Sequence, residues 1–172
     1  FGLADRVAVY QYRVKDAVND LRAWPEAGAQ VSYSGGLIEN IWSLGDAGQL
    51  GYSPTWTGNY RTARGWLTTA GRPRLDIVNF SFHHALLPLL DDSAVRKEIQ
   101  LYKRVYADAW GASPAPSRGV FPSEMAFSER LIPILVSEGI DWSIVSAEKI
   151  SRACPDFPLV LGSGGVNCDP PN

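Results

Sequence analysis

The sequence has few of the residues that build metal and redox sites. Its 172 residues include only two histidines, two cysteines and one methionine. The cysteines, Cys154 and Cys168, have no second pair and no histidine near them, so they do not match the spacing of a zinc site. The histidines, His83 and His84, are adjacent, and neighbouring residues of a strand point to opposite faces. We therefore expect no metal and no cofactor.

Long apolar segments and an excess of one charge are absent as well. No apolar run approaches the roughly 20 residues that a membrane-spanning helix needs. The formal net charge is -2 and the pI is about 5.7, which gives no basis for binding a polyanion. The glycine-rich stretch at 162–165 lacks the Lys-Ser/Thr pair of a phosphate-binding loop. We expect no membrane, no nucleic acid and no nucleotide as a partner.

The C-terminal region holds both cysteines in a segment rich in glycine and proline. A disulfide between them would indicate an oxidising compartment, and we expect a secreted or extracytoplasmic protein; two free thiols would leave a cytoplasmic one open. The chain starts, FGLADRVAVY, as though inside a domain and stops, CDPPN, in a loop-like stretch. We expect residues 1–172 to be a single partial domain, truncated at both ends.

Helical and extended patterns alternate along the chain. Apolar spacing predicts helices over residues 14–24, 37–44, 61–69, 93–110, a segment that ends near 138, and 147–151. Strands are predicted over residues 30–34, 74–82, 119–121 and 141–146, and a long loop over 45–60. Asp92 is the expected N-cap of the 93–110 helix, which Gly111 ends. Crossovers long enough to hold helices predict parallel strands in an α/β fold.

The ends of these strands carry the candidate functional groups, because ligands of parallel α/β proteins bind outside the carboxyl ends of the strands. The groups are His83 and His84 after the second strand, Ser123 and Glu124 after the third, and Ser146 and Glu148 after the fourth. Glu124 lies between Phe121 and Phe127, whose rings would lower the water content around it. A carboxylate in this place can act as a nucleophile, a general base or a metal ligand. The alternative, a first-turn residue that complements the dipole of the next helix, stays open.

Aromatic residues are plentiful, with six Trp, seven Tyr and six Phe. Several of them sit among polar and glycine residues rather than in apolar runs. Flat rings in such surroundings stack on ligands with apolar faces, and sugars are one such class. Ordinary packing is the alternative for each ring.

Two of these segments resemble glycoside hydrolase family 57. His84 to Leu90, HALLPLL, is similar to a stretch of that family in which His precedes an apolar pair and Pro-Leu-Leu. Gly119 to Glu124, GVFPSE, is similar to a later segment in which a glycine, an apolar residue, an aromatic residue and a proline precede a glutamate. The stretch GIDWSIVS and the upstream YRVKDAVNDL and VSYSGGLIENI resemble neighbouring elements of the same barrel.

The resemblance implies an incomplete (β/α)7-type barrel with parallel strands that alternate with helices. It implies a retaining glycoside hydrolase or glucanotransferase that acts on α-glucans, with a polysaccharide or oligosaccharide as substrate. In this reading Glu124 is the catalytic nucleophile. The expected substrate-binding residues are His84, His83, Phe121, Trp56, Tyr60 and Trp66, the last three as rings that stack on sugars at the rim.

Departures from the family pattern keep two alternatives open. Phe121 stands where Trp is usual, and Pro122-Ser123 replaces a pair of the Leu-Pro type. The opening His-Gln-Pro strand is missing, and no residue matches the acid/base Asp, since Asp169 follows too soon. One alternative is a polysaccharide deacetylase-like hydrolase, which would need an Asp and two His around a metal. The other is a non-catalytic carbohydrate-binding member of the family, which would need no second acid.

Overall fold

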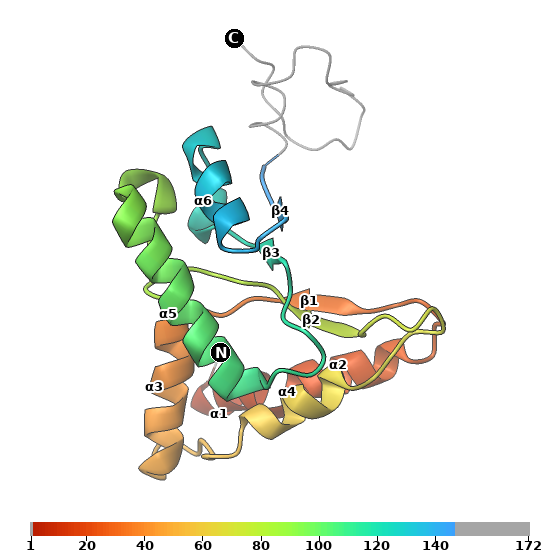
Figure 1. Ribbon diagram of the computed structural model, residues 1–172. Helices are drawn as coiled ribbons and strands as arrows, with labels where there is room; N and C mark the ends of the chain where they lie inside the picture. The colour runs from red at the N-terminus through yellow and green to blue at the C-terminus, as the bar shows by residue number, and fades with distance from the viewer. Residues whose placement is uncertain (1, 147–172) are drawn as a thin grey trace, which may run out of the picture.

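The computed structural model describes residues 2–146 as helices arranged around short strands (Figure 1). The α-helices are α1 (Leu3–Ala8), α2 (Val14–Leu21), α3 (Gly35–Asp46), α4 (Thr57–Arg64), α5 (Asp92–Trp110) and α6 (Ile132–Ser137). The other helical turns are a π-helix, η1 (Val9–Arg13), and the 3-10 turns η2 (Leu87–Leu89), η3 (Ser123–Met125) and η4 (Glu129–Leu131). The strands are β1 (Ala29–Val31), β2 (Leu75–Ile77), β3 (Gly119–Val120) and β4 (Trp142–Ser143). The helix predicted over 147–151 and both cysteines lie outside the described residues.

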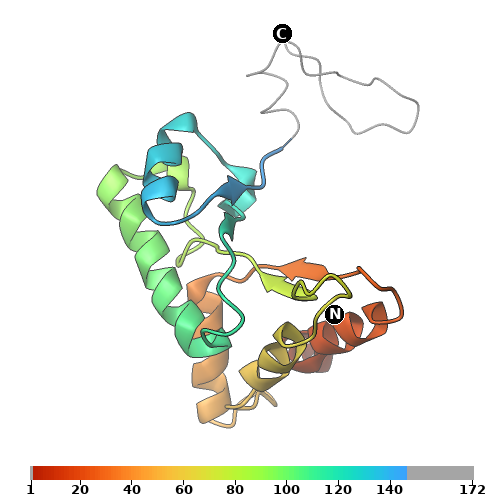
Figure 2. The ribbon, with the colours of Figure 1, turned by 45° about the vertical axis from the view of Figure 1, so that its right-hand side comes forward.

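The strands lie side by side in chain order, and every pairing is parallel. β1 pairs with β2, with Ala29 opposite Leu75, and β3 pairs with β4. A parallel bridge between Asn79 and Val120 connects the two pairs just beyond the end of β2. Helices or helical turns fill each crossover (Figure 2), so the predicted α/β class with parallel strands is confirmed. Residues 2–146 do not close a barrel, and the barrel stays a prediction.

The first helical segment is longer than the sequence predicts. α1, η1 and α2 follow one another without a break, so the segment begins at Leu3 rather than at 14 and ends at Leu21 rather than at 24. Val7 and Val18 are both buried and lie about three turns apart, which extends one apolar stripe along the segment. At its end, the guanidinium of Arg74 donates to the carbonyl oxygens of Leu21 and Trp24, and the Leu21 carbonyl also accepts from the Trp24 amide.

α4 occupies part of the stretch that the sequence predicts as a loop. Trp56, Tyr60 and Ala63 are at most 2% exposed, and their spacing places them on one helix face. The glycine, threonine and asparagine residues around them hide that stripe in the sequence. The helix therefore spans Thr57–Arg64 rather than 61–69.

α5 is predicted almost to the residue, but Asp91 rather than Asp92 caps it. The Asp91 carboxylate accepts a hydrogen bond of 2.9 Å from the Ala94 amide. Gly111 ends the helix as predicted, with a φ of +75° that suits glycine. Although α5 has 19 residues, neither it nor any other helix in residues 2–146 is long and apolar enough to cross a membrane.

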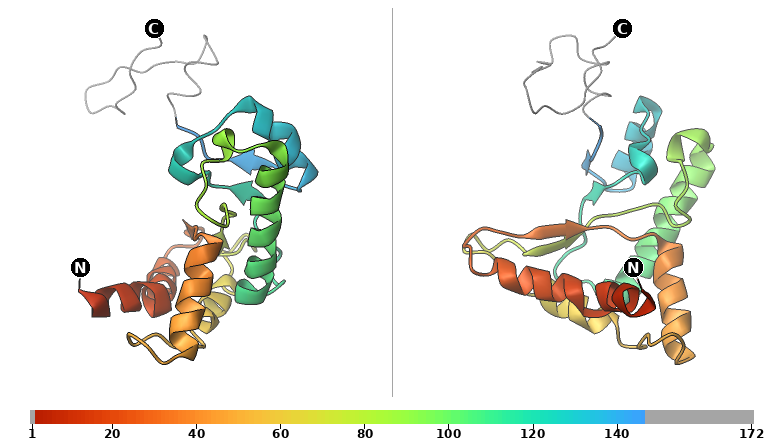
Figure 3. Two further views of the ribbon diagram at one scale, coloured as in Figure 1. Left: turned by 90° about the vertical axis from the view of Figure 1, so that its left-hand side faces the viewer. Right: turned by 180° about the vertical axis from the view of Figure 1, so that it is seen from behind.

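Two apolar clusters form the core, and α5 contributes to both. The larger cluster packs α2, α3 and α4 against β2 and the C-terminal half of α5. The smaller cluster packs the N-terminal half of α5 against β3 and α6. Figure 3 shows α5 beside α3, with α4 near one end and α6 near the other. The buried Arg64 of α4 donates to the carbonyl oxygens of Trp110 and Pro114, at 2.6 Å each, and so fixes the chain that leads from α5 to β3.

The regular strands are shorter than the sequence predicts. β2 ends at Ile77 rather than at 82, and β1 and β4 are shorter than expected as well. The helix predicted to end near 138 begins only at Ile132, after the turns η3 and η4. The irregular segments that follow β2 and β3 carry His84 and Glu124, which places both residues beyond the regular strands.

Candidate active site

A hollow of about 380 Å³ opens at the carboxyl ends of β1, β2 and β3, and we refer to it as the strand-end hollow. Residues that closely follow each of these three strands line the hollow. The lining consists of Ser32, Tyr33 and Ser34 after β1, Leu37 in α3, Phe80 and His84 after β2, and Phe121, Glu124 and Met125 after β3. Its position is the one at which parallel α/β proteins bind ligands, and its volume suits a small molecule.

The side chains of Glu124 and His84 meet in the strand-end hollow. His84 Nε2 lies 3.4 Å from Glu124 Oε1, which is long for a hydrogen bond. Both side chains are mostly exposed, at 76% for Glu124 and 55% for His84. Within residues 2–146, no group of three His, Cys, Asp or Glu side chains is placed to hold a metal ion. Because both side chains are exposed and lie close together, the carboxylate and the imidazole can both contact one ligand bound in the hollow.

Aromatic rings form an apolar wall beside these polar groups. Phe80 and Phe121 stack with centroids 6.0 Å apart and planes 12° apart, and the His84 ring meets Phe80 edge-on at 5.0 Å. On the β1 side, the Tyr33 hydroxyl lies 3.0 Å from the Tyr60 hydroxyl. Burial raises the pKa of Tyr33, so this residue offers a neutral hydroxyl. An apolar wall with a few polar groups is typical of small-molecule sites.

Three residues of the hollow have a left-handed backbone conformation. The φ angles are +60° at His84, +55° at Glu124 and +51° at Met125, and Leu50 is the one other non-glycine residue of this kind in the described chain. Such a conformation costs on the order of 1–3 kcal/mol and persists only where the surrounding structure imposes it. Its concentration around one hollow is typical of a functional site.

Buried polar groups hold the irregular segment after β2 in place. Glu98 of α5 is 7% exposed, accepts a 2.8 Å hydrogen bond from the His83 amide, and lies 2.6 Å from His83 Nδ1. The buried Asn79 side chain donates to the carbonyl oxygens of Ser117 and Gly119, at 2.7 and 2.8 Å. These bonds anchor the segment after β2 to α5 and to the start of β3.

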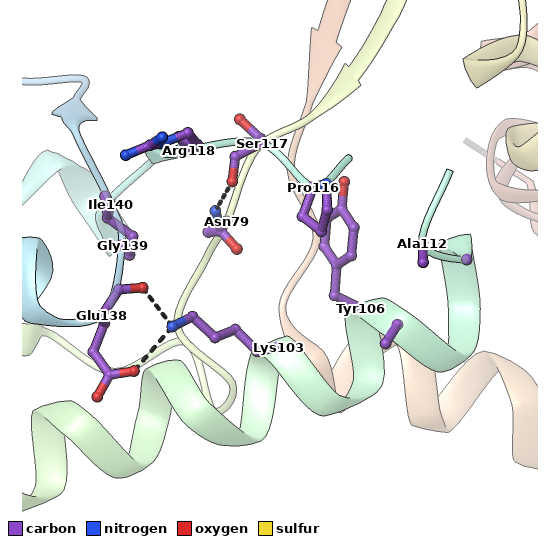
Figure 4. Close-up of a pocket in the computed structure, with 12 residues that line it drawn as sticks. Asn79, Lys103, Tyr106, Ala112, Pro116, Ser117, Arg118, Glu138, Gly139 and Ile140 are labelled. Atoms are coloured by element: carbon purple, nitrogen blue, oxygen red, sulfur yellow. Dashed lines mark hydrogen bonds and ion pairs between the residues drawn. The ribbon is translucent and has the colours of Figure 1, made fainter. Parts of the chain in front are cut away.

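A second hollow, of about 280 Å³, lies at the amino ends of β3 and β4 (Figure 4). Ser117, which precedes β3, and Gly139, which precedes β4, both line it. Its acid, Glu138, is held by Lys103 Nζ at 2.9 Å, and this hydrogen bond lowers the pKa of Glu138. We identify the strand-end hollow as the candidate active site, because it combines an exposed carboxylate with the carboxyl ends of the strands.

Comparison with known proteins shows the family to which this chain belongs. The model of Glycosyl hydrolase family 57 matches residues 14–156, which is most of the chain. An alpha-amylase of Niallia circulans is 37% identical, over 86% of this chain and 12% of its own length. The chain belongs to glycosyl hydrolase family 57. The crystal structure of 4-alpha-glucanotransferase from Thermococcus litoralis shares the fold, with a TM-score of 0.65 and 22% identity over 90% of this chain and 21% of that one.

This family 57 chain therefore spans only a small part of the length of both relatives, at 12% and 21%. Because most of each relative has no counterpart in this chain, the activity and the substrates of the whole protein are proposed below. Residues 2–146 themselves contain a set of parallel strands and the strand-end hollow.

Three aromatic residues that we predicted at the rim of the site lie elsewhere in this family 57 chain. Trp56 and Tyr60 are 2% and 1% exposed and belong to the larger core cluster. Trp66 lies near the amino end of β2, where its carbonyl oxygen accepts from the Arg74 amide and its ring packs against the Arg22 guanidinium at 5.0 Å. The prediction that these rings stack on a ligand at the rim is wrong, because helix spacing buries the first two and the third is at the opposite edge.

The other predicted residues divide into two groups. His84 and Phe121 line the strand-end hollow with Glu124, and their roles there stay predictions. His83 turns to Glu98 instead, so its expected place in the site is wrong. Phe127 packs on the smaller core cluster, and Glu124 is therefore not enclosed between two rings as expected.

Several lining residues were not among the predicted site residues. Tyr33 and Ser34 lie just beyond β1, but the sequence places both inside the predicted strand 30–34, so they carried no strand-end signal. Ser34 also caps α3 by accepting a 3.3 Å hydrogen bond from the Leu37 amide, and this ordinary role obscured the other. Phe80 reads as part of a long strand in the sequence, whereas the strand has already ended.

Proposed function

We propose that this chain carries the nucleophile of a retaining glycoside hydrolase or glucanotransferase that acts on α-glucans, and that the nucleophile is Glu124. Family membership supports the reaction class, and the relative named alpha-amylase supports the substrate class. One observation carries the assignment to a residue. The Glu124 carboxylate is 76% exposed, lines the strand-end hollow and lies 3.4 Å from His84.

In this reaction the Glu124 carboxylate attacks the anomeric carbon of a bound sugar. A bond forms between a Glu124 oxygen and this carbon while the glycosidic bond breaks, and an acid group protonates the leaving oxygen. The same group then takes a proton from water or from a sugar hydroxyl. The oxygen of this acceptor bonds to the anomeric carbon while the bond to Glu124 breaks, so the product has the same anomeric configuration as the substrate. Water as acceptor gives hydrolysis, and a sugar as acceptor gives transfer.

The surroundings of Glu124 suit a sugar ring. The stacked rings of Phe80 and Phe121 offer an apolar surface to one face of a sugar, and His84 lies close enough to Glu124 to bind a hydroxyl of the same ring. Retaining enzymes hold their two carboxyl groups about 5–5.5 Å apart. Among residues 2–146, Glu124 is the one carboxylate that lines the strand-end hollow, so we expect the acid/base group from another part of the protein.

The substitution Glu124→Gln in the full-length protein tests this proposal. Glutamine has nearly the same shape, but its amide does not attack the anomeric carbon. We expect kcat on an α-glucan to fall by about 10³-fold or more, while the glucan still binds. Glu129→Gln is the matched control, because Glu129 is an exposed acid in η4 and does not line the hollow.

Turnover of Glu124→Gln at the rate of the wild type would refute the assignment. A wild-type protein that binds α-glucans without converting them would instead favour the non-catalytic carbohydrate-binding alternative.

A further inference from the structure

We propose that Ser81 and Ser123 form a hydrogen-bonded pair that positions the Glu124 carboxylate, an inference that rests on the proposed role of Glu124. The two hydroxyl oxygens lie 2.8 Å apart, and each serine is only 1% exposed. Ser81 follows β2 and Ser123 follows β3. The pair therefore joins the two segments that carry His84 and Glu124.

The surrounding groups set the direction of these hydrogen bonds. Ser81 Oγ lies 3.3 Å from the carbonyl oxygen of Ala85, which can only accept. When Ser81 donates to Ala85, its own oxygen accepts the hydrogen of Ser123. The resulting chain runs from Ser123, directly before Glu124, to Ala85, directly after His84. One end of this chain therefore adjoins Glu124 and the other adjoins His84, the two left-handed residues whose side chains meet in the hollow.

The pairing of the strands does not itself need this contact. Backbone hydrogen bonds already join Asn79 to Gly119 and to Phe121, at 3.1 and 2.9 Å. Within the described residues, no backbone hydrogen bond joins these two segments after Asn79 and Phe121. The serine pair is two residues further along each segment. It thus extends the connection between β2 and β3 to the residue that precedes Glu124.

Glu124 depends on such an anchor because its own side chain is 76% exposed and packing does not hold it. A catalytic group must be held within about 0.5 Å of its productive position. A displacement of about 1 Å can reduce a rate on the order of 100-fold. Ser123 is the buried residue next to Glu124, so its hydroxyl is the nearest fixed point for the turn η3.

Alanine substitutions of the two serines, singly and together, test the proposal in the full-length protein. We expect Ser123→Ala and Ser81→Ala each to lower kcat on an α-glucan by about 10- to 100-fold. KM should stay within about 2-fold of wild type, because the groups that contact the sugar remain. Ser123→Cys keeps a weaker donor of similar size and should retain more activity than Ser123→Ala.

The double variant separates positioning from packing. Ser81→Ala leaves the buried Ser123 hydroxyl without its partner and lowers the melting temperature, whereas the double variant removes both hydroxyls and should regain stability. Its kcat should nevertheless stay as low as in the single variants. Ser117→Ala is the control: it loses hydrogen bonds to the Asp76 carboxylate and from the Gly119 amide at the opposite end of β3, and should keep the wild-type kcat.

A double variant that regains both stability and the wild-type kcat would show that the pair only packs the strands, and would overturn the proposal. Single variants with unchanged kcat would overturn it as well. If Glu124→Gln is inactive while the serine variants are fully active, the positioning role fails alone. If Glu124→Gln is as active as wild type, the proposed function fails and the positioning role fails with it.

Discussion

At the scale of single residues, His83 and His84 show how two adjacent identical residues take different places. The left-handed conformation of His84 turns its ring toward Glu124. His83 instead donates a hydrogen bond from its backbone amide to the carboxylate of Glu98, a buried acid of α5, and its ring nitrogen Nδ1 contacts the same carboxylate. Glu98 therefore holds the turn from which His84 reaches the strand-end hollow.

The substitution Glu98→Gln tests this support. Glutamine has one acceptor oxygen in place of two, so one of the two His83 contacts loses its acceptor. We expect the free energy of unfolding, measured in urea, to fall by about 1–3 kcal/mol. Asp108→Asn, at an exposed acid of the same helix, should change it by less than about 0.5 kcal/mol. Equal losses in the two variants would contradict a specific role for Glu98.

Sequence position was enough to place Glu124 and His84, because residues that follow parallel strands gather at one edge. It was not enough to place Trp56 and Tyr60, whose polar neighbours suggested exposure although their spacing buries them. The left-handed backbone of Glu124 has no sequence signal either, because glutamate, unlike glycine or asparagine, is not associated with that conformation.

At the scale of elements, a salt bridge holds the end of α6 against α5. Lys103 of α5 binds the Glu138 carboxylate at 2.9 Å, and Glu138 follows the last residue of α6 (Figure 4). This hydrogen bond is the main reason that the pKa of Glu138 lies below its ordinary value of 4.5. The chain turns into β4 immediately afterwards, at Gly139.

Lys103→Met should lower the free energy of unfolding at pH 7 by on the order of 1 kcal/mol. Since the pKa of Glu138 is lower in the folded protein, its stabilising effect is complete above about pH 4.5 and is lost as the pH falls through the lower, folded value. The difference between wild type and Lys103→Met should therefore shrink below that pH in urea unfolding. Lys97→Met, at an exposed lysine of the same helix, is the control. A difference that does not change with pH would argue against this pair.

The length of an element decided how well the sequence predicted it. α5 has 19 residues, a repeated apolar stripe and a capping acid, and its bounds were predicted closely. The strands have two or three residues each, which is too short for an alternating pattern to mark where they end. The error in α4 has a different cause, because its buried stripe comprises only a few residues among turn-forming ones.

At the scale of the whole molecule, parallel strands in chain order bring distant residues to one edge. Residues 32–34, 80–84 and 121–125 follow three successive strands and contribute to the lining of the strand-end hollow. The alternation of helices and strands predicted this edge from the sequence. The residues that line it could not be deduced in the same way, because they depend on how α3, β2 and β3 pack together.

Trapping of the covalent intermediate tests the central claim most directly. The full-length protein is incubated with a fluorinated α-glucosyl donor, which slows the release of the sugar, and the labelled protein is mapped by peptide mass spectrometry. If Glu124 is the nucleophile, one glycosyl group is found on the Glu124 side chain, and Glu124→Gln acquires none. A glycosyl group on a different carboxylate, or conversion of the donor with no label at Glu124, would contradict the account.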